Sequence, residues 1–197
     1  MRLILASASP RRRELLERLG LPFEVRPSGI EEPLAAGVPA STLATTLARA
    51  KAADIADRLR AAGEAALVLG ADTLVVLDGQ PLGKPTSQGD ARAMLRALRG
   101  RSHEVVTAVV VRDADPAGRE LTEAVVSQVL MRDYTDDEIA AYVATGEPDD
   151  KAGAYAVQGR GRRLVSRVDG CYTNVVGLPL RTTARLLQAF GLRPASI

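Results

Sequence analysis

The chain is poor in the residues that build disulfides and metal clusters. Its 197 residues include one cysteine, Cys171, one histidine, His103, and no tryptophan. A single cysteine excludes a disulfide within the chain, and together with one histidine it leaves no basis for a zinc cluster. The lone histidine also counts against a Ser-His-Asp hydrolase, because His103 begins a predicted strand and is better explained as a structural residue. This composition fits a reducing compartment.

The chain also has no large excess of positive or negative charge and no long apolar run. Lysine and arginine number 26 against 24 aspartate and glutamate, and the net charge of +2 is too small to indicate general nucleic-acid binding. No apolar run approaches the roughly 18 residues of a membrane span, and the apolar residues 3–6 are too few for the core of a signal peptide. We therefore expect a cytoplasmic protein with no membrane or nucleic-acid partner.

The hydrophobic content of 46% is enough for a sizeable core, and the chain shows no linker, internal repeat or low-complexity tract. We therefore expect one domain over residues 1–197. Apolar periodicity predicts strands at 2–6, 23–26, 105–113 and 120–133, and helices at 10–19, 40–62, 88–99, 135–145 and 177–191. Strands that alternate with helices, together with antiparallel hairpins, indicate an α/β fold with a mixed twisted sheet flanked by helices.

Some segments carry finer expectations. In the helix at 40–62 the spacing turns Leu43, Leu47, Ala50 and Ile55 inward and the lysines and arginines outward. The next buried strand is expected to be interrupted at 70–73 and to end in a turn at 78–79. The segment 151–170 alternates glycines with short apolar stretches, which we interpret as short strands.

The first predicted helix begins with three arginines. Ser9 can cap this helix and Pro10 suits its first position, so residues 11–13 fall in the first turn. Cations are disfavoured there by the helix dipole, whereas the free N–H groups suit an anion, above all a phosphate. The alternative is structural, because Glu14 and Glu17 could pair with the arginines along the helix.

Asp72 interrupts an otherwise apolar strand, where an ionised carboxylate is costly to bury without a cation or several donors. The alternative is a bulge beside Gly70, in which Asp72 bonds its own turn. Glu31, Glu32 and the lysines at 51 and 84 each fit a solvated surface when taken singly. Together with the arginine turn they supply carboxylates for a hard divalent metal and cations for a polyphosphate, which favours a nucleotide hydrolase.

Other nucleotide-binding patterns are missing. The chain has no GxxxxGK[ST] loop and no GxGxxG after a strand, which counts against ATP-driven motors and dinucleotide enzymes. The segment QGRGRR could be a basic RNA contact, but aromatic residues for base stacking do not surround it.

Five segments, taken in order, resemble the Maf family of nucleoside triphosphate pyrophosphatases. They are ASASPRR at 6–12, GADT at 70–73, GKP at 83–85, KAGAYAVQG at 151–159 and VVGLP at 175–179. The resemblance runs from residue 3 to about 190 and implies a mixed α/β fold of two lobes with a central cleft, related to the inosine triphosphate pyrophosphatases.

The resemblance also implies roles for individual residues. Asp72 would be the catalytic proton acceptor. The remaining positions are Ser7, Ser9, Arg11 and Arg12 in the phosphate loop, Glu32 with Asp72 as ligands of a divalent cation, Mg²⁺ or Mn²⁺, and Lys51 and Lys84 as catalytic lysines of the cleft. Whether Asp72 binds the metal, acts as the base or does both is not decided by the sequence.

Within this family the chain resembles the subgroup that acts on dTTP and UTP, at Arg12, Thr73 and Gln158. The Gln158 amide offers a donor and an acceptor that match O4 and N3–H of uracil or thymine, whereas cytosine reverses that pattern. The expected reaction converts dTTP, UTP and modified pyrimidine triphosphates to the monophosphate and pyrophosphate, as nucleotide-pool housekeeping.

Two alternatives stand beside this expectation. One is a 7-methyl-GTP pyrophosphatase, and the other is a regulatory protein that inhibits septum formation, a role that could coexist with hydrolysis. A homodimer stays open. The family motifs do not explain Arg13 or the arginines between 160 and 163, which we interpret as surface features.

Overall fold

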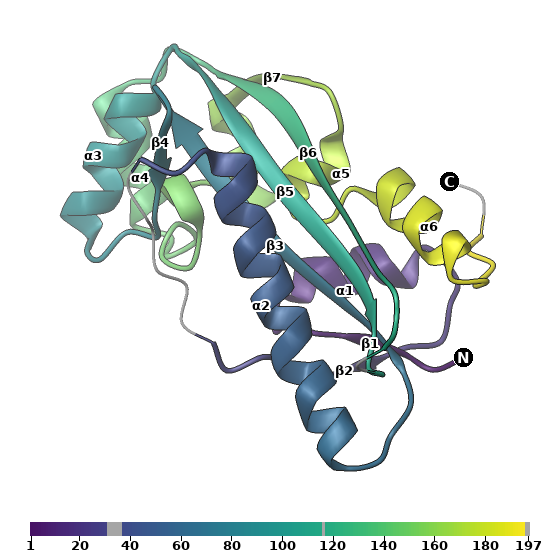
Figure 1. The fold of residues 1–197 in the computed structure, drawn as a ribbon. Helices are drawn as coiled ribbons and strands as arrows, with labels where there is room; N and C mark the ends of the chain where they lie inside the picture. Colours follow the sequence, from purple (N-terminus) through teal and green to yellow (C-terminus); the bar gives the residue numbers. More distant parts are fainter. Residues whose placement is uncertain (31–36, 116, 196–197) are drawn as a thin grey trace.

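The computed structural model describes residues 1–30, 37–115 and 117–195, and its centre is a twisted sheet of seven strands (Figure 1). The strands are β1 (Leu3–Leu5), β2 (Glu24–Val25), β3 (Leu67–Leu77), β4 (Gln80–Leu82), β5 (Ser102–Asp113), β6 (Glu120–Met131) and β7 (Val165–Asp169). Their order is β2-β1-β3-β5-β6-β7, and β4 pairs with β3. β1 runs parallel to β2 and β3, and the other pairs are antiparallel, which confirms the predicted mixed sheet.

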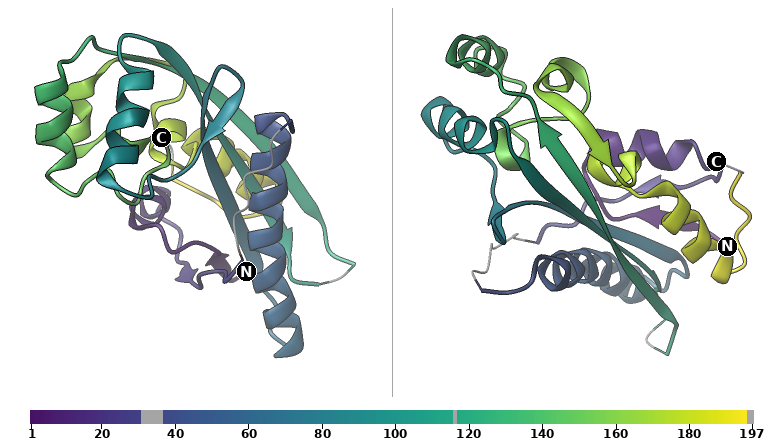
Figure 2. Two further views of the ribbon diagram at one scale, coloured as in Figure 1. Left: turned by 90° about the vertical axis from the view of Figure 1, so that its left-hand side faces the viewer. Right: turned by 90° about the horizontal axis from the view of Figure 1, so that it is seen from above.

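Helices cover both faces of the sheet. They are α1 (Pro10–Glu17), α2 (Ala40–Ala61), α3 (Gln88–Leu98), α4 (Asp136–Val143), α5 (Tyr172–Val176) and α6 (Leu180–Ala189), with 3₁₀ turns η1 (Ala152–Ala154) and η2 (Gly159–Leu164). The right-hand view of Figure 2 shows α2 on one side of the sheet and α1 and α6 on the other. No helix in the described parts of the chain is long and apolar enough to cross a membrane.

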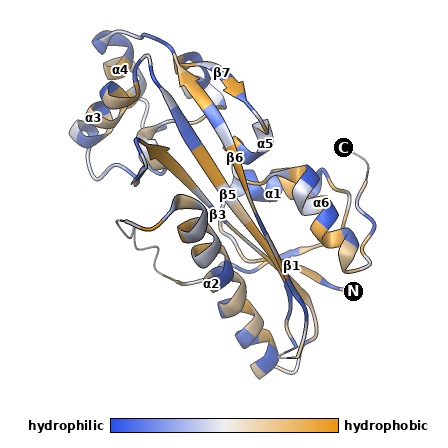
Figure 3. Ribbon diagram, turned by 45° about the horizontal axis from the view of Figure 1, so that its top comes forward, coloured by the Kyte–Doolittle hydropathy of each residue, from blue (hydrophilic) through white to orange (hydrophobic). Residues whose placement is uncertain are grey.

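Alternation along the strands divides the core into two clusters. On β3, Val68 and Leu74 face α2 and pack against residues such as Ile55, whereas Leu69 and Val75 face the other helices. Figure 3 shows the hydrophobic stretches of β3 and β5 in the middle of the molecule. Successive residues of β3 therefore serve opposite faces, and this alternation places the site described below.

The long strands β3, β5 and β6 join two groups of elements (Figure 1). β1, β2, α1 and α6 lie toward one end of these strands, and α3, α4 and β4 lie toward the other. This is the two-lobed arrangement that the resemblance implies.

Most predicted helices and strands lie within a few residues of their expected bounds, but the interruption predicted at 70–73 is wrong. β3 is continuous across it. Gly70 keeps its extended backbone and admits the close approach of α2, because a Cβ there would lie 2.4 Å from the Ala48 carbonyl oxygen and 2.9 Å from the Ala52 Cβ. Because the strand is not interrupted, the interpretation of Asp72 as part of a bulge is also wrong.

Two further expectations need correction. Ala152–Ala154 and Gly159–Leu164 form 3₁₀ turns rather than short strands, because Gly153, Ala154 and Gly159 take φ values of 69°, 58° and 63°, which a strand cannot contain. The expectation of a short strand in the segment 151–170 is confirmed at β7 (Val165–Asp169). The structure also adds α5, a helix of five residues before the predicted closing helix. The turn at Asp78 and Gly79 is confirmed, with φ of 52° and 75°, typical of a two-residue hairpin.

Gly70→Ala is expected to destabilise the fold by about 1–3 kcal/mol and to lower activity, because the new methyl group must push α2 away from β3. Gly89→Ala in α3 is the matched control, since its Cβ would meet only the Ser87 hydroxyl oxygen at 3.7 Å. Urea unfolding of both variants checks this, and equal stability of the two would contradict it.

Candidate active site

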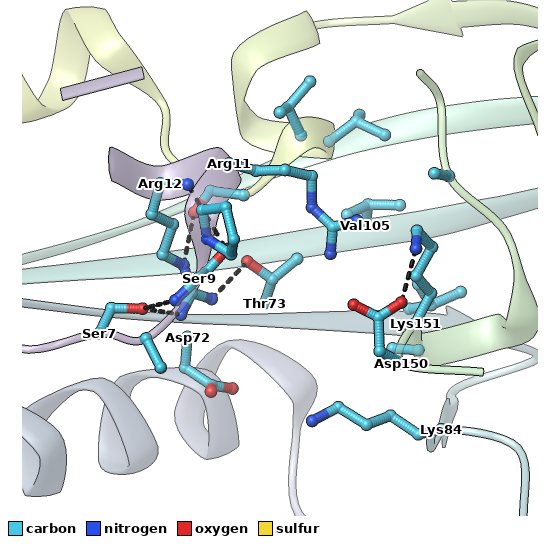
Figure 4. A pocket seen from close by; sticks show the side chains of 18 of the residues that line it. Ser7, Ser9, Arg11, Arg12, Asp72, Thr73, Lys84, Val105, Asp150 and Lys151 are labelled. Carbon is cyan, nitrogen blue, oxygen red and sulfur yellow. Dashed lines mark hydrogen bonds and ion pairs between the residues drawn. The ribbon is translucent and has the colours of Figure 1, made fainter. Parts of the chain in front are cut away.

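A pocket of about 390 Å³ lies at the edge of β3. β1 pairs with residues 67–69 of β3 and β4 pairs with residues 75–77, both on the side of β3 opposite to β5. Between these pairings the strand edge faces the pocket, and Asp72 and Thr73 lie there among the lining residues (Figure 4). The carboxyl end of a parallel strand pair is a common place for a ligand site, and β1 ends beside this pocket.

Asp72 and Thr73 reach the pocket from opposite faces of the sheet. Asp72 points to the α2 side, where its Oδ1 lies 2.6 Å from Nζ of Lys51. Both side chains are about nine-tenths buried or more, with 5% and 7% exposed. The predicted need of Asp72 for a cation is therefore met by α2, and the expectation that the lysines of this helix point outward is wrong for Lys51.

Such a buried pair has a high cost if it is broken. Each ion loses several kcal/mol of hydration, and the partner and further hydrogen bonds offset this loss, so removal of one partner typically costs about 3–5 kcal/mol. A catalytic role accounts for a buried charge pair at a pocket wall better than stability does, because well-packed apolar residues stabilise a core at least as well.

The turn before α1 supplies the next wall of the pocket. Ser9 caps the helix by accepting a hydrogen bond from the Arg12 backbone N–H at 3.4 Å, as predicted. Within the described parts of the chain, the Arg12 guanidinium donates to the Gly177 backbone carbonyl at 3.0 Å, the Ser7 hydroxyl at 3.2 Å and the Thr73 hydroxyl at 3.1 Å (Figure 4). Arg12 thus joins α1, β3 and the end of α5 across the pocket.

The three arginines of this turn separate into two kinds. Arg11 and Arg12 line the pocket, whereas Arg13 is exposed and pairs with Glu17 at 3.0 Å. The structural alternative, ion pairs along the helix, is therefore right for Arg13, and the anion site stays a prediction for the other two.

The far wall carries further charges. Lys84 follows β4 and lines the pocket, and Lys151 donates from Nζ to an Asp150 carboxylate oxygen and to the Glu147 carbonyl, each at 2.6 Å (Figure 4). The hydrogen bond from Lys151 lowers the pKa of Asp150. Among the described residues, five cations line the pocket together with the carboxylates of Asp72 and Asp150, an excess of positive charge that suits a polyanionic ligand. The cations are Arg11, Arg12, Lys51, Lys84 and Lys151.

Gln158 lines the pocket from an exposed position at the start of η2. Its loop is held by Glu147, whose carboxylate accepts from the backbone N–H groups of Arg160 at 3.0 Å and Gly161 at 2.9 Å and from the Tyr142 hydroxyl at 3.1 Å. Partial burial acts to raise the pKa of Glu147, but these hydrogen bonds outweigh it and lower the pKa.

One side of the pocket is apolar. It is lined by Val75, Val105, Val157, Val175 and Val176, with Tyr155 beside them. A pocket lined by both apolar side chains and cations matches a ligand that has a flat ring and phosphates.

His103 supports this wall from behind. Its Nε2 lies 2.7 Å from the Tyr155 hydroxyl oxygen, and burial lowers the pKa of His103 to about 4. The structural role predicted for His103 agrees with this position.

His103 is therefore expected to make the fold acid-sensitive. Below pH 6.5 the unfolded chain binds a proton that the folded chain excludes down to about pH 4, so stability falls as the pH falls across this window. The loss between pH 7 and pH 4.5 is about 2.5 kcal/mol from this residue alone. Urea unfolding of wild type and His103→Gln at both pH values checks it, and an identical pH dependence of the two would contradict it.

One carboxylate of the pocket, that of Asp72, is of the kind that a hard divalent cation binds. Glu31 and Glu32 lie outside the described residues, and within the described ranges no three His, Cys, Asp or Glu side chains form a cluster. Mg²⁺ is commonly held by one or two carboxylates together with substrate phosphates, so the carboxylate of Asp72 beside a polyphosphate pocket is compatible with it.

The structure brings together nearly all the predicted site residues. Ser7, Ser9, Arg11, Arg12, Lys51, Asp72, Thr73, Lys84 and Gln158 all line this one pocket. Sequence reasoning missed Lys151, Asp150 and Glu147. The first two lie in or beside the KAGAYAVQG segment and could have been found there, whereas nothing in the local sequence marks Glu147.

A family model described as Maf-like protein matches residues 2–190. The chain belongs to the Maf family. It is 53% identical over 191 residues to a dTTP/UTP pyrophosphatase of Moorella thermoacetica, covering 97% of this chain and 96% of that protein. A dTTP/UTP pyrophosphatase of Pelotomaculum thermopropionicum is 47% identical over 189 residues, with 96% of each chain covered. The predicted family resemblance is thereby confirmed.

A likeness among solved structures is weaker. A nucleoside-triphosphatase, or dITP/XTP pyrophosphatase, of Mycobacterium abscessus aligns over 96% of this Maf chain and 97% of its own, with 15% identity and a TM-score of 0.48. At that TM-score the likeness supports no argument about the pocket.

Proposed function

We propose that this Maf protein hydrolyses dTTP and UTP to the nucleoside monophosphate and pyrophosphate. The observation that carries the proposal is one pocket in which a buried Asp72–Lys51 pair lies beside a capped helix N-terminus with two arginines. The two relatives described above, at about half identity over nearly the whole chain, carry the same activity in their names.

In this proposal Asp72 accepts a proton from the water that attacks the α-phosphorus, and Lys51 holds its carboxylate in place. The bond between the α-phosphorus and the bridging oxygen then breaks, and pyrophosphate leaves. Arg11, Arg12 and Lys84 stabilise the negative charge that develops on this leaving group.

A divalent cation, Mg²⁺ or Mn²⁺, fits the site beside Asp72, with Glu32 as the second ligand that the family resemblance implies. When bound, it polarises the phosphate as a Lewis acid. The base would lie on the apolar wall, where Gln158 can read its edge.

A pyrophosphate-release panel tests the function. It compares dTTP, UTP, CTP, the purine triphosphates and 7-methyl-GTP, each with Mg²⁺, with Mn²⁺ and after treatment with EDTA. The proposal expects turnover of dTTP and UTP that EDTA removes and the metal restores. Preference for 7-methyl-GTP would instead support the other pyrophosphatase of this family.

Gln158→Glu is expected to lower kcat/KM for UTP and dTTP selectively, because a carboxylate cannot donate to O4 and repels it. CTP should suffer less, since its exocyclic amine can donate to the new acceptor. A mismatched polar group in a pocket costs about 1–3 kcal/mol, so the UTP-to-CTP preference should fall by roughly tenfold. An unchanged ratio of kcat/KM values would remove Gln158 from base selection.

A cytoplasmic location and an oligomeric state stay predictions. The substrates proposed here are cytoplasmic metabolites, which supports the first. Size-exclusion chromatography with light scattering distinguishes a monomer from a homodimer.

A further inference from the structure

A chain of hydrogen bonds continues from the pocket into the core behind it. The Arg12 guanidinium donates to the Thr73 hydroxyl at 3.1 Å, and the Thr73 and Thr107 hydroxyl oxygens lie 2.9 Å apart. The Thr107 hydroxyl donates to the backbone carbonyl oxygen of Asn174 at 2.9 Å. Thr73 of β3 and Thr107 of β5 are direct partners in the sheet register. Thr107 is fully buried and is not a lining residue of the pocket, and Thr73 lies between it and the pocket.

The two ends of this chain determine its direction. A guanidinium only donates hydrogen bonds, and a carbonyl oxygen only accepts them. Each threonine hydroxyl has a single proton, so Thr107 gives its proton to Asn174 and must accept the proton of Thr73. Thr73 in turn accepts from Arg12, and its own proton is already used.

The far end of the chain is held firmly. The Asn174 amide nitrogen donates to the Val105 carbonyl and to the Ser127 hydroxyl, each at 2.9 Å, and Asn174 is fully buried. Arg12 also binds the Gly177 carbonyl at the end of the same helix, α5. The two threonines therefore lie inside a closed ring of contacts among α1, β3, β5 and α5.

We propose that Thr107 is a positioning residue for substrate selection, which holds the Thr73 hydroxyl so that it presents only a hydrogen-bond acceptor to the nucleotide. The inference rests on the proposed function of this pocket, and it adds that in the contact between Thr73 and the nucleotide the nucleotide is the hydrogen-bond donor. The matching group on the nucleotide is a donor, either the N3–H of the base or a hydroxyl of the sugar. A nucleotide acceptor placed against Thr73 is rejected, because no proton is left to meet it.

Thr107→Val tests this directly, because it keeps the shape and removes the hydroxyl. The Thr73 proton is then released and Thr73 can donate as well as accept, so selection between triphosphates should relax. We expect the ratio of kcat/KM between the preferred triphosphate and CTP to fall about fivefold, mostly through KM, as for one neutral hydrogen bond. Thr107→Ser should restore most of the ratio.

Thr183→Val is the matched control. Thr183 is also fully buried and donates to a carbonyl, that of Pro179 at 3.0 Å, but it lies in α6 and is not a lining residue of the pocket. Both valine variants should lose similar thermal stability, and only Thr107→Val should change the substrate ratio. An unchanged ratio in Thr107→Val, together with an unchanged discrimination against a 3′-deoxy nucleotide, would overturn the proposal and leave Thr107 a structural residue.

Two more variants keep the test decisive. If Thr107→Val does not fold, Thr107→Ser and Thr107→Cys are compared instead, because the thiol is the weaker donor. Equal selection by these two variants, both among the triphosphates and against a 3′-deoxy nucleotide, would overturn the proposal. Thr73→Val should relax selection too, and adding Thr107→Val to it should change the ratio no further. An additive effect would show that Thr107 does not act through Thr73.

The two sources of the donor are separated with substrate analogues. An N3-methyl uridine triphosphate lacks the base donor, and a 3′-deoxy nucleotide lacks the sugar donor that dTTP and UTP share. The analogue that lacks the true donor should show the larger loss of kcat/KM in the wild type, and this loss should be smaller in Thr107→Val, because Thr73 is then no longer fixed as an acceptor; losses unchanged for both analogues would overturn the acceptor role. If the wild type prefers a different triphosphate, the proposed function is wrong. The role of Thr107 is then decided by the ratio of kcat/KM for the two best substrates, compared between the wild type and Thr107→Val.

Discussion

Asp72→Asn is expected to abolish turnover, with a loss of kcat of a thousandfold or more, about 4 kcal/mol or above. The substitution keeps the shape of the side chain and removes the charge that serves as proton acceptor and suits a divalent cation. More than about a tenth of wild-type kcat, a loss under about 1.4 kcal/mol, would contradict the role of Asp72.

The buried ion pair makes a second control necessary for this variant. Asp72→Asn removes the carboxylate that lies 2.6 Å from the buried Lys51 ammonium, so it should also lose about 3–5 kcal/mol of stability. Asp72→Asn combined with Lys51→Met removes both charges and should recover much of that stability while staying inactive. Activity regained together with stability would mean that the single variant failed by unfolding.

Arg12→Ala is expected to lower kcat/KM for dTTP and UTP by about 100-fold, about 2.7 kcal/mol. The variant loses a cation at the helix N-terminus and three hydrogen bonds that join the walls of the pocket. Arg12→Lys keeps the charge but not the planar donor pattern, so it should recover only part of the loss. Pyrophosphate-release kinetics on the folded fraction measure both.

Arg13→Ala is the matched control for this experiment. Arg13 belongs to the same turn but forms an exposed pair with Glu17, and such pairs contribute about 0–1 kcal/mol. Its activity should equal that of the wild type. Equal losses of activity and stability in Arg12→Ala and Arg13→Ala would indicate that the arginine turn has a structural role only.

Several features of this fold followed from local sequence. Ser9 and Pro10 predicted the start of α1, and the Asp78–Gly79 pair predicted the turn after β3, because both depend on the conformational preferences of a few adjacent residues. The burial of Lys51 could not be predicted in this way. Helical periodicity assigns a lysine to the outer face, and only the partner across the helix–sheet interface reverses that assignment.

The continuity of β3 is a similar case. A glycine followed by a charged residue in an apolar strand is typical of an interruption when only the local pattern is considered. The strand continues because β5 pairs with it along its length and because α2 packs against Gly70 so closely that a side chain would not fit. Both reasons come from segments distant in the sequence.

The sequence by itself determined the family, through five motifs in order, and with it the chemistry expected of Asp72, the arginine turn and the lysines, because such motifs record residue types and spacing. Only the tertiary structure decided which charges meet. Asp72 faces Lys51 because even positions of this stretch of β3 point to α2, and Thr73 faces Arg12 and Thr107 because odd positions point away. Pairings of this kind depend on strand register and helix packing, which join residues 21 to 165 positions apart and leave no mark in the neighbouring sequence.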